Sequence, residues 1–262
     1  MKSVRHKDTK KEDVYINSEM DYEPRRHPKY EDAGENTVKV LVWELPVRLW
    51  HWINAACIAI LMVTGYFIGK PFLSASIQEE AYYSFLMGWS RYIHFFTAFV
   101  FTAALLVRIY WSFVGNKYSI FTVFKKGFWK EMFETVKYYL FMKNKKPHYV
   151  GHNPLAQFAY WVMFGACCII IIFTGYFLYI EPQHESMFGF LFAWVPYVFG
   201  DSSSIRTWHH LAAWGIIIFT VVHIYLAFRE DYLQRNGTMS SIITGYKTES
   251  KKHVVGGEDD KQ

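Results

Sequence analysis

Four long apolar stretches, separated by polar segments, dominate the pattern of this 262-residue chain. They run over about residues 49–68, 92–114, 155–180 and 206–228. Each is long enough to cross a bilayer as a helix, because about 20 apolar residues span its ~30 Å hydrocarbon core. The pattern therefore predicts an all-α integral membrane protein built as a bundle of four transmembrane helices.

Two shorter apolar stretches are predicted to lie at the membrane surfaces. Residues 128–140 place aromatic and aliphatic side chains on one helical face, and lysines and a glutamate on the other. This is typical of an amphipathic interfacial helix, here between the second and third spans. Residues 187–200 are interrupted by Pro196 and are too short to cross, so we expect them to rest at the outer interface.

The charge of the connecting loops predicts the orientation of the spans. Residues 115–150 contain eight Lys and two acidic residues, whereas residues 70–89 contain one Lys and two Glu. Residues 181–207 contain one Arg and three acidic residues. Because loops rich in Lys and Arg stay on the cytoplasmic side, both termini, residues 115–150 and the amphipathic helix are expected in the cytoplasm.

The two ends of the chain and its cysteines narrow the class of protein. Residues 1–37 are charged and poor in apolar side chains, which predicts a flexible polar tail. Residues 38–247 form the expected membrane domain, and residues 248–262 a second polar tail.

No CxxCH or CxxC motif occurs, which argues against covalent haem and cysteine-ligated metal. The positive charges lie in loops beside the spans, so we expect lipid contacts and no nucleic-acid partner.

Histidines within the apolar spans carry the candidate chemistry, because ionisable side chains inside a membrane usually indicate function. His209 and His223 are fourteen residues apart, which puts them on nearly one helical face, about 21 Å apart along the axis. In the predicted topology His94 shares the outer depth with His209, and His51 shares the inner depth with His223.

Two imidazoles at one depth on different helices predict a b-type haem, whose iron takes an axial ligand on each face. We expect one or two such haems, with His51 and His223 as one ligand pair and His94 and His209 as the other. Zinc would need more ligands at each depth, and a proton relay would be expected to use acidic residues, which these spans lack. Polar packing between helices remains the alternative. His210 is turned about 100° from His209, and we prefer His209 because it shares the face of His223.

Two arginines lie close in sequence or depth to the inner histidines. Arg108 follows His94 by fourteen residues, and Arg48 precedes His51 by three. Either guanidinium could bind a haem propionate, which suits its forked donors. The alternative is that each side chain extends to the lipid headgroups.

A polar segment opens the third span at its inner end. Asn153 stands before Pro154, an order typical of a helix N-cap. His152, Asn153 and Gln157 also lie within about one helical turn, at the depth of the inner histidines. Such donors could hold a quinone carbonyl and pass it protons.

A faint repeat relates the first two spans to the last two. The sequence TGYF occurs at 64–67 and again at 174–177. The other correspondences are His94 with His209, Arg108 with His223, and His51 with Trp161. The repeat predicts a duplicated helical hairpin, although matches this short also arise by chance in apolar sequence. Its glycines, Gly65 and Gly175, permit close approach of a helix or of a flat macrocycle, and helix packing is the simpler interpretation.

Several motifs together resemble a known family. They are PVRLWHW (46–52), MVTGYFIG (62–69), RIYWSFVG (108–115), GHNPLAQ (151–157) and TWHHLAAWGIIIFTVVHIYLAFRED (207–231). The chain resembles, over about residues 38–247, the b-type cytochrome subunit of membrane-bound, uptake-type nickel–iron hydrogenases. It is more distantly similar to the cytochrome b subunit of formate dehydrogenase.

The resemblance implies an electron-transfer subunit of a hydrogen:quinone oxidoreductase in the bacterial inner membrane, and not the hydrogen-splitting subunit. It implies a hetero-oligomer with the hydrogenase small and large subunits, which this chain anchors, and electron transfer through haem b to quinone. The family's haem ligands match His51, His94, His209 and His223, and its quinone-side residues match the GHNPLAQ segment. His210 departs from the basic residue, such as Arg, expected there. A formate dehydrogenase-like complex and a haem-free membrane anchor are the alternatives.

Overall fold

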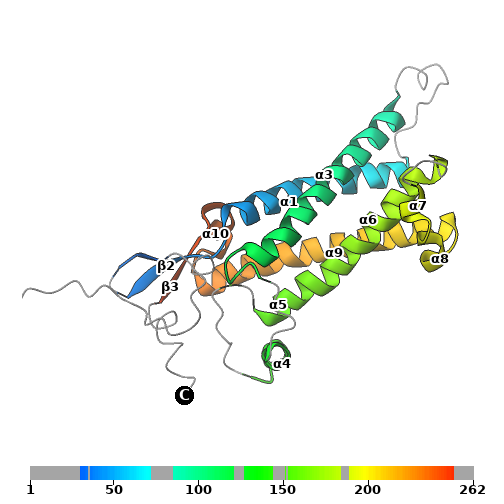
Figure 1. Cartoon of the computed structure of the whole chain (residues 1–262). Helices are drawn as coiled ribbons and strands as arrows, with labels where there is room; N and C mark the ends of the chain where they lie inside the picture. The colour runs from blue at the N-terminus through cyan, green and yellow to red at the C-terminus, as the bar shows by residue number, and fades with distance from the viewer. Residues whose placement is uncertain are drawn as a thin grey trace, which may run out of the picture.

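The computed structural model describes residues 30–34, 36–71, 85–120, 127–143, 151, 153–183 and 189–250. Four helices in this part of the chain are long and apolar enough to cross a membrane, and Figure 1 shows them side by side. They are α1 (Leu45–Gly69), α3 (Leu86–Val114), a composite third span (Pro154–Ile180) and α9 (Ser202–Gln234). The predicted fold, a multi-pass bundle of four membrane helices, is confirmed.

The third span changes its helical geometry within the first half of its length. It consists of α5 (Pro154–Phe158), the π-helix η1 (Ala159–Phe164) and α6 (Gly165–Ile180). The Asn153 side chain accepts a hydrogen bond from the Ala156 amide at 2.8 Å, and Pro154 occupies the first turn. The predicted N-cap is therefore present, because these two residues satisfy or remove amide donors that a helix start leaves unpaired. The π-helix was not predicted.

The spans pack as two antiparallel hairpins, since α1 packs mainly against α3 and α6 mainly against α9. Side chains from all four spans meet midway between the ends of the bundle. This central cluster comprises Cys57, Phe101, Phe164, Cys168 and Ile216. The close packing of α6 on α9 needs a glycine, because a Cβ at Gly215 would lie 2.7 Å from the Cys167 sulfur.

A three-stranded antiparallel sheet closes one end of the bundle and was not predicted. Its order is β1 (Tyr30–Asp32), β2 (Thr37–Leu41) and β3 (Tyr246–Ser250), with Val38 paired to Glu249. β1 and the last residues of β3 belong to the segments expected to be polar tails. Val38 and Val40 are buried in a small core with Val42 and Trp43. The sheet and the preceding helix α10 (Thr238–Thr244) define what we call the sheet end.

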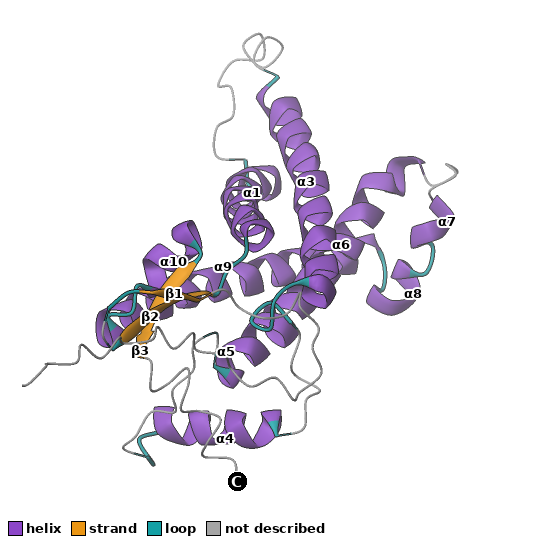
Figure 2. Ribbon diagram, turned by 60° about the vertical axis from the view of Figure 1, so that its left-hand side comes forward, coloured by secondary structure: helices purple, strands orange, loops and turns teal. Residues whose placement is uncertain are grey.

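The opposite end of the bundle carries the short helices α7 (Gly189–Phe192) and α8 (Val195–Phe199), preceded by a 3-10 turn (Glu181–Gln183). Figures 1 and 2 both place α7 and α8 away from the sheet. Pro196 lies in the first turn of α8, which explains why the apolar stretch predicted there divides into two short helices. We call this the α7/α8 end.

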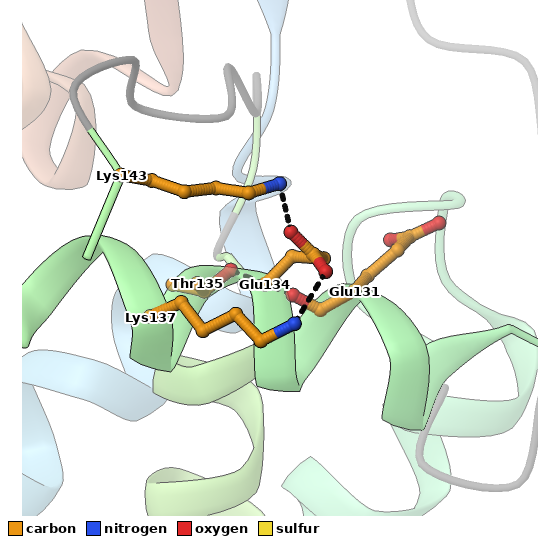
Figure 3. A network of polar contacts seen from close by, with 5 residues as sticks. All are labelled: Glu131, Glu134, Thr135, Lys137 and Lys143. Carbon is orange, nitrogen blue, oxygen red and sulfur yellow. Dashed lines mark hydrogen bonds and ion pairs between the residues drawn. The ribbon is translucent and has the colours of Figure 1, made fainter.

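The amphipathic helix predicted over 128–140 is present as α4 (Phe128–Tyr139). It buries Phe128 and Met132 against Leu155, Phe158 and Trp161 at the start of the third span. On its other side Glu134 pairs with Lys137 at 3.1 Å and with Lys143, as Figure 3 shows. Hydrogen bonds from Lys143 and Lys137 hold the pKa of the Glu134 carboxyl below its usual value. The side of the membrane on which α4 lies stays a prediction.

Candidate functional site

The structure brings His51 and His223 together near the sheet end. His51 belongs to α1 and His223 to α9, so the pair bridges the two hairpins. Their ring centroids are 6.3 Å apart, and the rings are tilted by 52°. The Phe219 ring stacks on His223 with a centroid distance of 5.8 Å and an angle of 9°. One turn of α9 thus supplies both the imidazole and the aromatic ring that orients it.

The spacing of this pair fits one metal atom between two imidazoles. A metal–nitrogen bond is about 2 Å long, and the ring centre lies about 1 Å further, so two such ligands put the centroids roughly 6 Å apart. Among the residues that the structure describes, no group of three or more His, Cys, Asp or Glu could hold a metal ion. The donor set therefore suits a cofactor that brings its own equatorial ligands, as haem does.

A second pair, His94 of α3 and His209 of α9, lies toward the α7/α8 end. The two side chains are close enough to interact electrostatically. Each is bonded to a threonine of its own hairpin: Thr64 Oγ1 lies 2.9 Å from His94 Nδ1, and Thr174 Oγ1 lies 3.1 Å from His209 Nδ1. The two halves of the bundle thus repeat one arrangement, which supports the predicted duplication.

The glycines beside these threonines accommodate the imidazole rings. A Cβ added to Gly65 would lie 3.1 Å from His94 Cε1, and one added to Gly175 would lie 3.0 Å from His209 Cε1. Both distances are shorter than ordinary carbon contacts. Close approach of a histidine, and not of a helix backbone, is therefore what these positions require.

The neighbouring His210 lies beside His209, with the two ring centroids 6.4 Å apart, but no hydrogen bond in the described part of the chain joins it to a threonine. Its side chain is exposed, and its Nε2 lies 3.5 Å from the Cβ position of Gly69 at the end of α1. It contacts neither of the two threonine–glycine pairs. The geometry favours His209 as the ligand, in agreement with the face that it shares with His223.

Arg108 lies inside the protein near the sheet end, and only 5% of its surface is exposed. Its guanidinium lies 4.7 Å from the Trp161 ring, 5.6 Å from the Trp50 ring and 6.0 Å from the Tyr160 ring. One donor, Nη2, reaches the Ser119 carbonyl at 3.2 Å. Extension to the lipid headgroups is therefore not its role, because aromatic rings surround the charge.

Several buried polar atoms of Arg108 and of residues 50–54 in α1 have no hydrogen-bond partner among the described residues. They are Arg108 Nε and Nη1, Trp50 Nε1, Asn54 Oδ1 and His51 Nδ1. Unpaired buried donors are costly, and such a group usually indicates a bound water, ion or ligand. A haem carboxylate would satisfy two of the guanidinium donors, so the residues present fit a haem between His51 and His223.

Arg48 has a different environment. Its Nη1 donates to the Ile243 carbonyl near the end of α10, while its Nε stays without a partner in the described part of the chain. It thus joins α1 to the segment leading into the sheet. Binding of a propionate by Arg48 stays a prediction.

Two of the candidate quinone residues, Asn153 and Gln157, lie where α4 meets the third span. Asn153 caps α5, and its side chain is also hydrogen-bonded to Tyr139, whose phenol has its pKa raised by burial. The backbone amide of Gln157 donates to the Asn153 carbonyl at 2.9 Å. His152 lies outside the described residues. A structural role for Asn153 is thus established, and a quinone contact stays a prediction.

Thr64, Thr174, Trp50 and Asn54 are site residues that sequence reasoning missed. The repeated TGYF did point to the first two, because it recurs in both halves with its threonine next to the glycine. Nothing in the sequence indicated that their hydroxyls meet histidines on the neighbouring helix.

Comparisons with known proteins agree with this geometry. A family model described as prokaryotic cytochrome b561 matches residues 42–245. The chain is 44% identical over 220 residues to the probable Ni/Fe-hydrogenase B-type cytochrome subunit of Rhizobium leguminosarum bv. viciae, covering 81% of this chain and 91% of that protein. It is 41% identical over 221 residues to the Cupriavidus necator protein of the same name, covering 82% of this chain and 90% of that protein.

The probable Ni/Fe-hydrogenase 1 B-type cytochrome subunit of Escherichia coli strain K12 is 40% identical over 227 residues, covering 83% of this chain and 94% of that protein. The family match spans all four membrane helices and both histidine pairs. The chain therefore belongs to the prokaryotic cytochrome b561 family, whose name implies b-type haem as its cofactor.

Proposed function

We propose that this chain is the haem b subunit that takes electrons from the small subunit of a nickel–iron hydrogenase, passes them to quinone, and anchors that enzyme in the membrane. The observation that carries the proposal is the presence of two histidine pairs, each bridging the two hairpins, at two depths of one bundle. The names of the relatives, all B-type cytochrome subunits of Ni/Fe hydrogenases, favour the hydrogenase small and large subunits as partners.

The histidines hold the cofactor and define the electron path. Bound between two imidazoles, a b-type haem supplies reversible one-electron transfer. His51 with His223, and His94 with His209, are the proposed axial ligands of two haems. Because fourteen residues of α9 separate His209 from His223, the two sites are about 21 Å apart along the helix. The chain thereby carries electrons over most of the bilayer thickness.

The sheet end is the proposed cytoplasmic end, and the protein is proposed to lie in the bacterial inner membrane with both termini in the cytoplasm. The lysine-rich residues 115–150 join spans at the sheet end, whereas the lysine-poor residues 70–89 and 181–207 join them at the α7/α8 end. Loops rich in Lys and Arg are retained on the cytoplasmic side. The hydrogenase would then dock at the α7/α8 end, where electrons enter.

The proposed quinone site lies beside α4 and the start of the third span. His152, Asn153 and Gln157 would hold the quinone carbonyl groups, and Arg108 would pair with a haem propionate close by. If the protons for quinone come from the cytoplasm while hydrogen is oxidised outside, each electron crossing separates charge. Moving one charge across 100 mV is worth about 2.3 kcal/mol. Quinone reduction in sealed vesicles should therefore generate a membrane potential.

Spectra of histidine variants test the ligand assignment. The reduced-minus-oxidised spectrum of the purified wild type should contain low-spin haem b bands, and a pyridine haemochrome assay gives the haem count. We expect His94→Ala and His209→Ala to lose one haem, and His51→Ala and His223→Ala to lose the other. His210→Ala is the matched control and should keep both. Loss with His210→Ala but not with His209→Ala would contradict the assignment.

The same preparation distinguishes the alternatives. A haem-free anchor would give no haem b bands in the wild type. Affinity purification from the native membrane identifies the partner: we expect a hydrogenase small and large subunit, whereas recovery of formate dehydrogenase subunits would favour the second complex.

A further inference from the structure

The hydrogen bonds of Thr64 and Thr174 determine which ring nitrogen of His94 and of His209 carries the proton. Thr64 Oγ1 lies 2.7 Å from the Ile60 carbonyl oxygen and 2.9 Å from His94 Nδ1. A hydroxyl has one proton to donate, and a carbonyl can only accept. The threonine therefore donates to Ile60 and accepts from the His94 Nδ1–H.

The second half of the bundle repeats this chain of bonds. Thr174 Oγ1 lies 2.6 Å from the Ile170 carbonyl oxygen and 3.1 Å from His209 Nδ1. With its proton committed to Ile170, this hydroxyl also accepts from the imidazole. In both histidines Nδ1 then carries the proton, and the unprotonated Nε2 is the nitrogen left to bind a metal.

We propose that Thr64 and Thr174 are positioning residues that hold His94 and His209 as Nε2 ligands and lower the reduction potential of the haem between them, relative to that of the haem at the sheet end. The inference rests on the proposed function, because it takes these histidines as haem ligands. An acceptor on Nδ1–H makes the imidazole more electron-rich, and a more electron-rich ligand stabilises the oxidised iron.

The sheet end differs in two ways that act in the opposite direction. His51 Nδ1 is buried without a hydrogen-bond partner among the residues that the structure describes, so no threonine or serine hydroxyl of those residues enriches this ligand. The Arg108 cation is also buried nearby, against the ring of Trp50. A positive charge in a medium of low dielectric constant favours the reduced, less positive cofactor. Both differences make transfer from the α7/α8 end to the sheet end downhill.

Redox titration of threonine variants tests the proposal. Thr64→Val and Thr174→Val keep the shape of the side chain but remove the hydroxyl acceptor, so the midpoint potential of one haem should rise in each and rise further in the double variant. The rise should be smaller for Thr174→Val, because the Ile171 backbone also makes a hydrogen bond with His209. That haem should be the one lost in His94→Ala, and its ferric low-spin EPR signal should shift as well. The other haem should keep the wild-type potential.

Two controls distinguish the effect of losing the hydroxyl from the effect of any change in side-chain packing. Thr64→Ser and Thr174→Ser restore the acceptor and should return the potential toward the wild-type value. Thr102→Val removes a hydroxyl that makes the same kind of backbone bond within α3, to the Ala98 carbonyl at 2.9 Å, but makes no bond to a histidine that the structure records. It should leave both potentials unchanged.

Each result of the redox titration either supports or overturns the proposal. Unchanged potentials in both valine variants at full haem content would overturn the proposal, as would a shift confined to the haem at the sheet end. If the valine variants lose the haem, retention in the serine variants supports the positioning role, and loss in the serine variants overturns it. Failure of the proposed function has a separate result, namely a wild type without haem, or one whose haem survives His94→Ala and His209→Ala.

Discussion

Replacing Gly175 by alanine should weaken haem binding at the α7/α8 end. The added Cβ would lie 3.0 Å from His209 Cε1, whereas carbon atoms at rest lie about 3.5–4.0 Å apart. The ring must then retreat by roughly 0.5–1 Å, and the bond from His209 Nδ1 to Thr174, now 3.1 Å long, limits that movement. The retreat also moves Nε2 away from the place where a metal would bind.

The size of the effect follows from packing energies. Overpacking by one methyl group typically costs about 1–3 kcal/mol. Since about 1.4 kcal/mol is tenfold in an equilibrium constant, the affinity for haem should fall roughly 5- to 150-fold. The measurement is the rate of haem transfer from detergent-solubilised protein to excess apomyoglobin, together with the haem content on purification.

Gly165→Ala is the control within the same span. There the nearest atom to an added Cβ is the Tyr160 carbonyl oxygen at 4.0 Å, so the methyl group meets open space. Alanine in place of glycine within a helix usually stabilises it by about 0.5–1 kcal/mol, and haem retention should match the wild type. If Gly175→Ala retains haem as tightly as Gly165→Ala, the glycine does not serve to admit the imidazole.

Three further predictions concern other parts of the molecule. Arg108→Gln removes the buried cation near the sheet-end pair, so a redox titration should find the potential of that haem lowered. Glu134→Gln removes a carboxylate whose pKa is lowered by its lysine partners. The ionised carboxylate stabilises the fold at neutral pH, and this stabilisation is lost as the pH falls through the lowered pKa. The thermal-stability difference from wild type should therefore be larger at pH 7 than below the ordinary glutamate pKa of about 4.3. Val40→Ala empties part of the fully buried sheet core and should cost about 1–3 kcal/mol, seen as faster proteolysis at the sheet end.

The spans and the depths of the histidines were predictable because both depend on local regularities. A membrane span is visible as about 20 consecutive apolar residues, and a spacing of fourteen residues within one helix determines a face and a height. His51 and His223 could thus be paired from spacing and loop charge alone. The observed centroid distance of 6.3 Å confirms that the structure brings the two rings together.

The sheet could not be predicted because its strands are short and the pairing of β2 with β3 is non-local. β2 and β3 have five residues each, and their paired residues are about two hundred positions apart, as with Val38 and Glu249. Hydrophobic alternation over five residues is a weak signal, and the polar character of the flanking sequence favoured tails. The π-helix Ala159–Phe164 was missed for a related reason, since its apolar sequence looks the same as that of an ordinary span. Two of its aromatic rings, Tyr160 and Trp161, enclose Arg108 together with Trp50 of α1.

The two ends of the bundle differ in how closely they follow the internal repeat. At the α7/α8 end both copies keep the same set, a histidine held by a threonine and admitted by a glycine. At the sheet end the repeat relates His51 to Trp161 and His223 to Arg108. The contacts follow the same relation: the ring centroids of His51 and His223 lie 6.3 Å apart, and the Arg108 guanidinium lies 4.7 Å from the Trp161 ring. Where the symmetry offers a place for a second imidazole pair, this chain has a cation enclosed by aromatic rings. A symmetric scaffold thereby acquires an electrostatic difference between its ends, and under the proposed function this difference would favour electron transfer toward the sheet end.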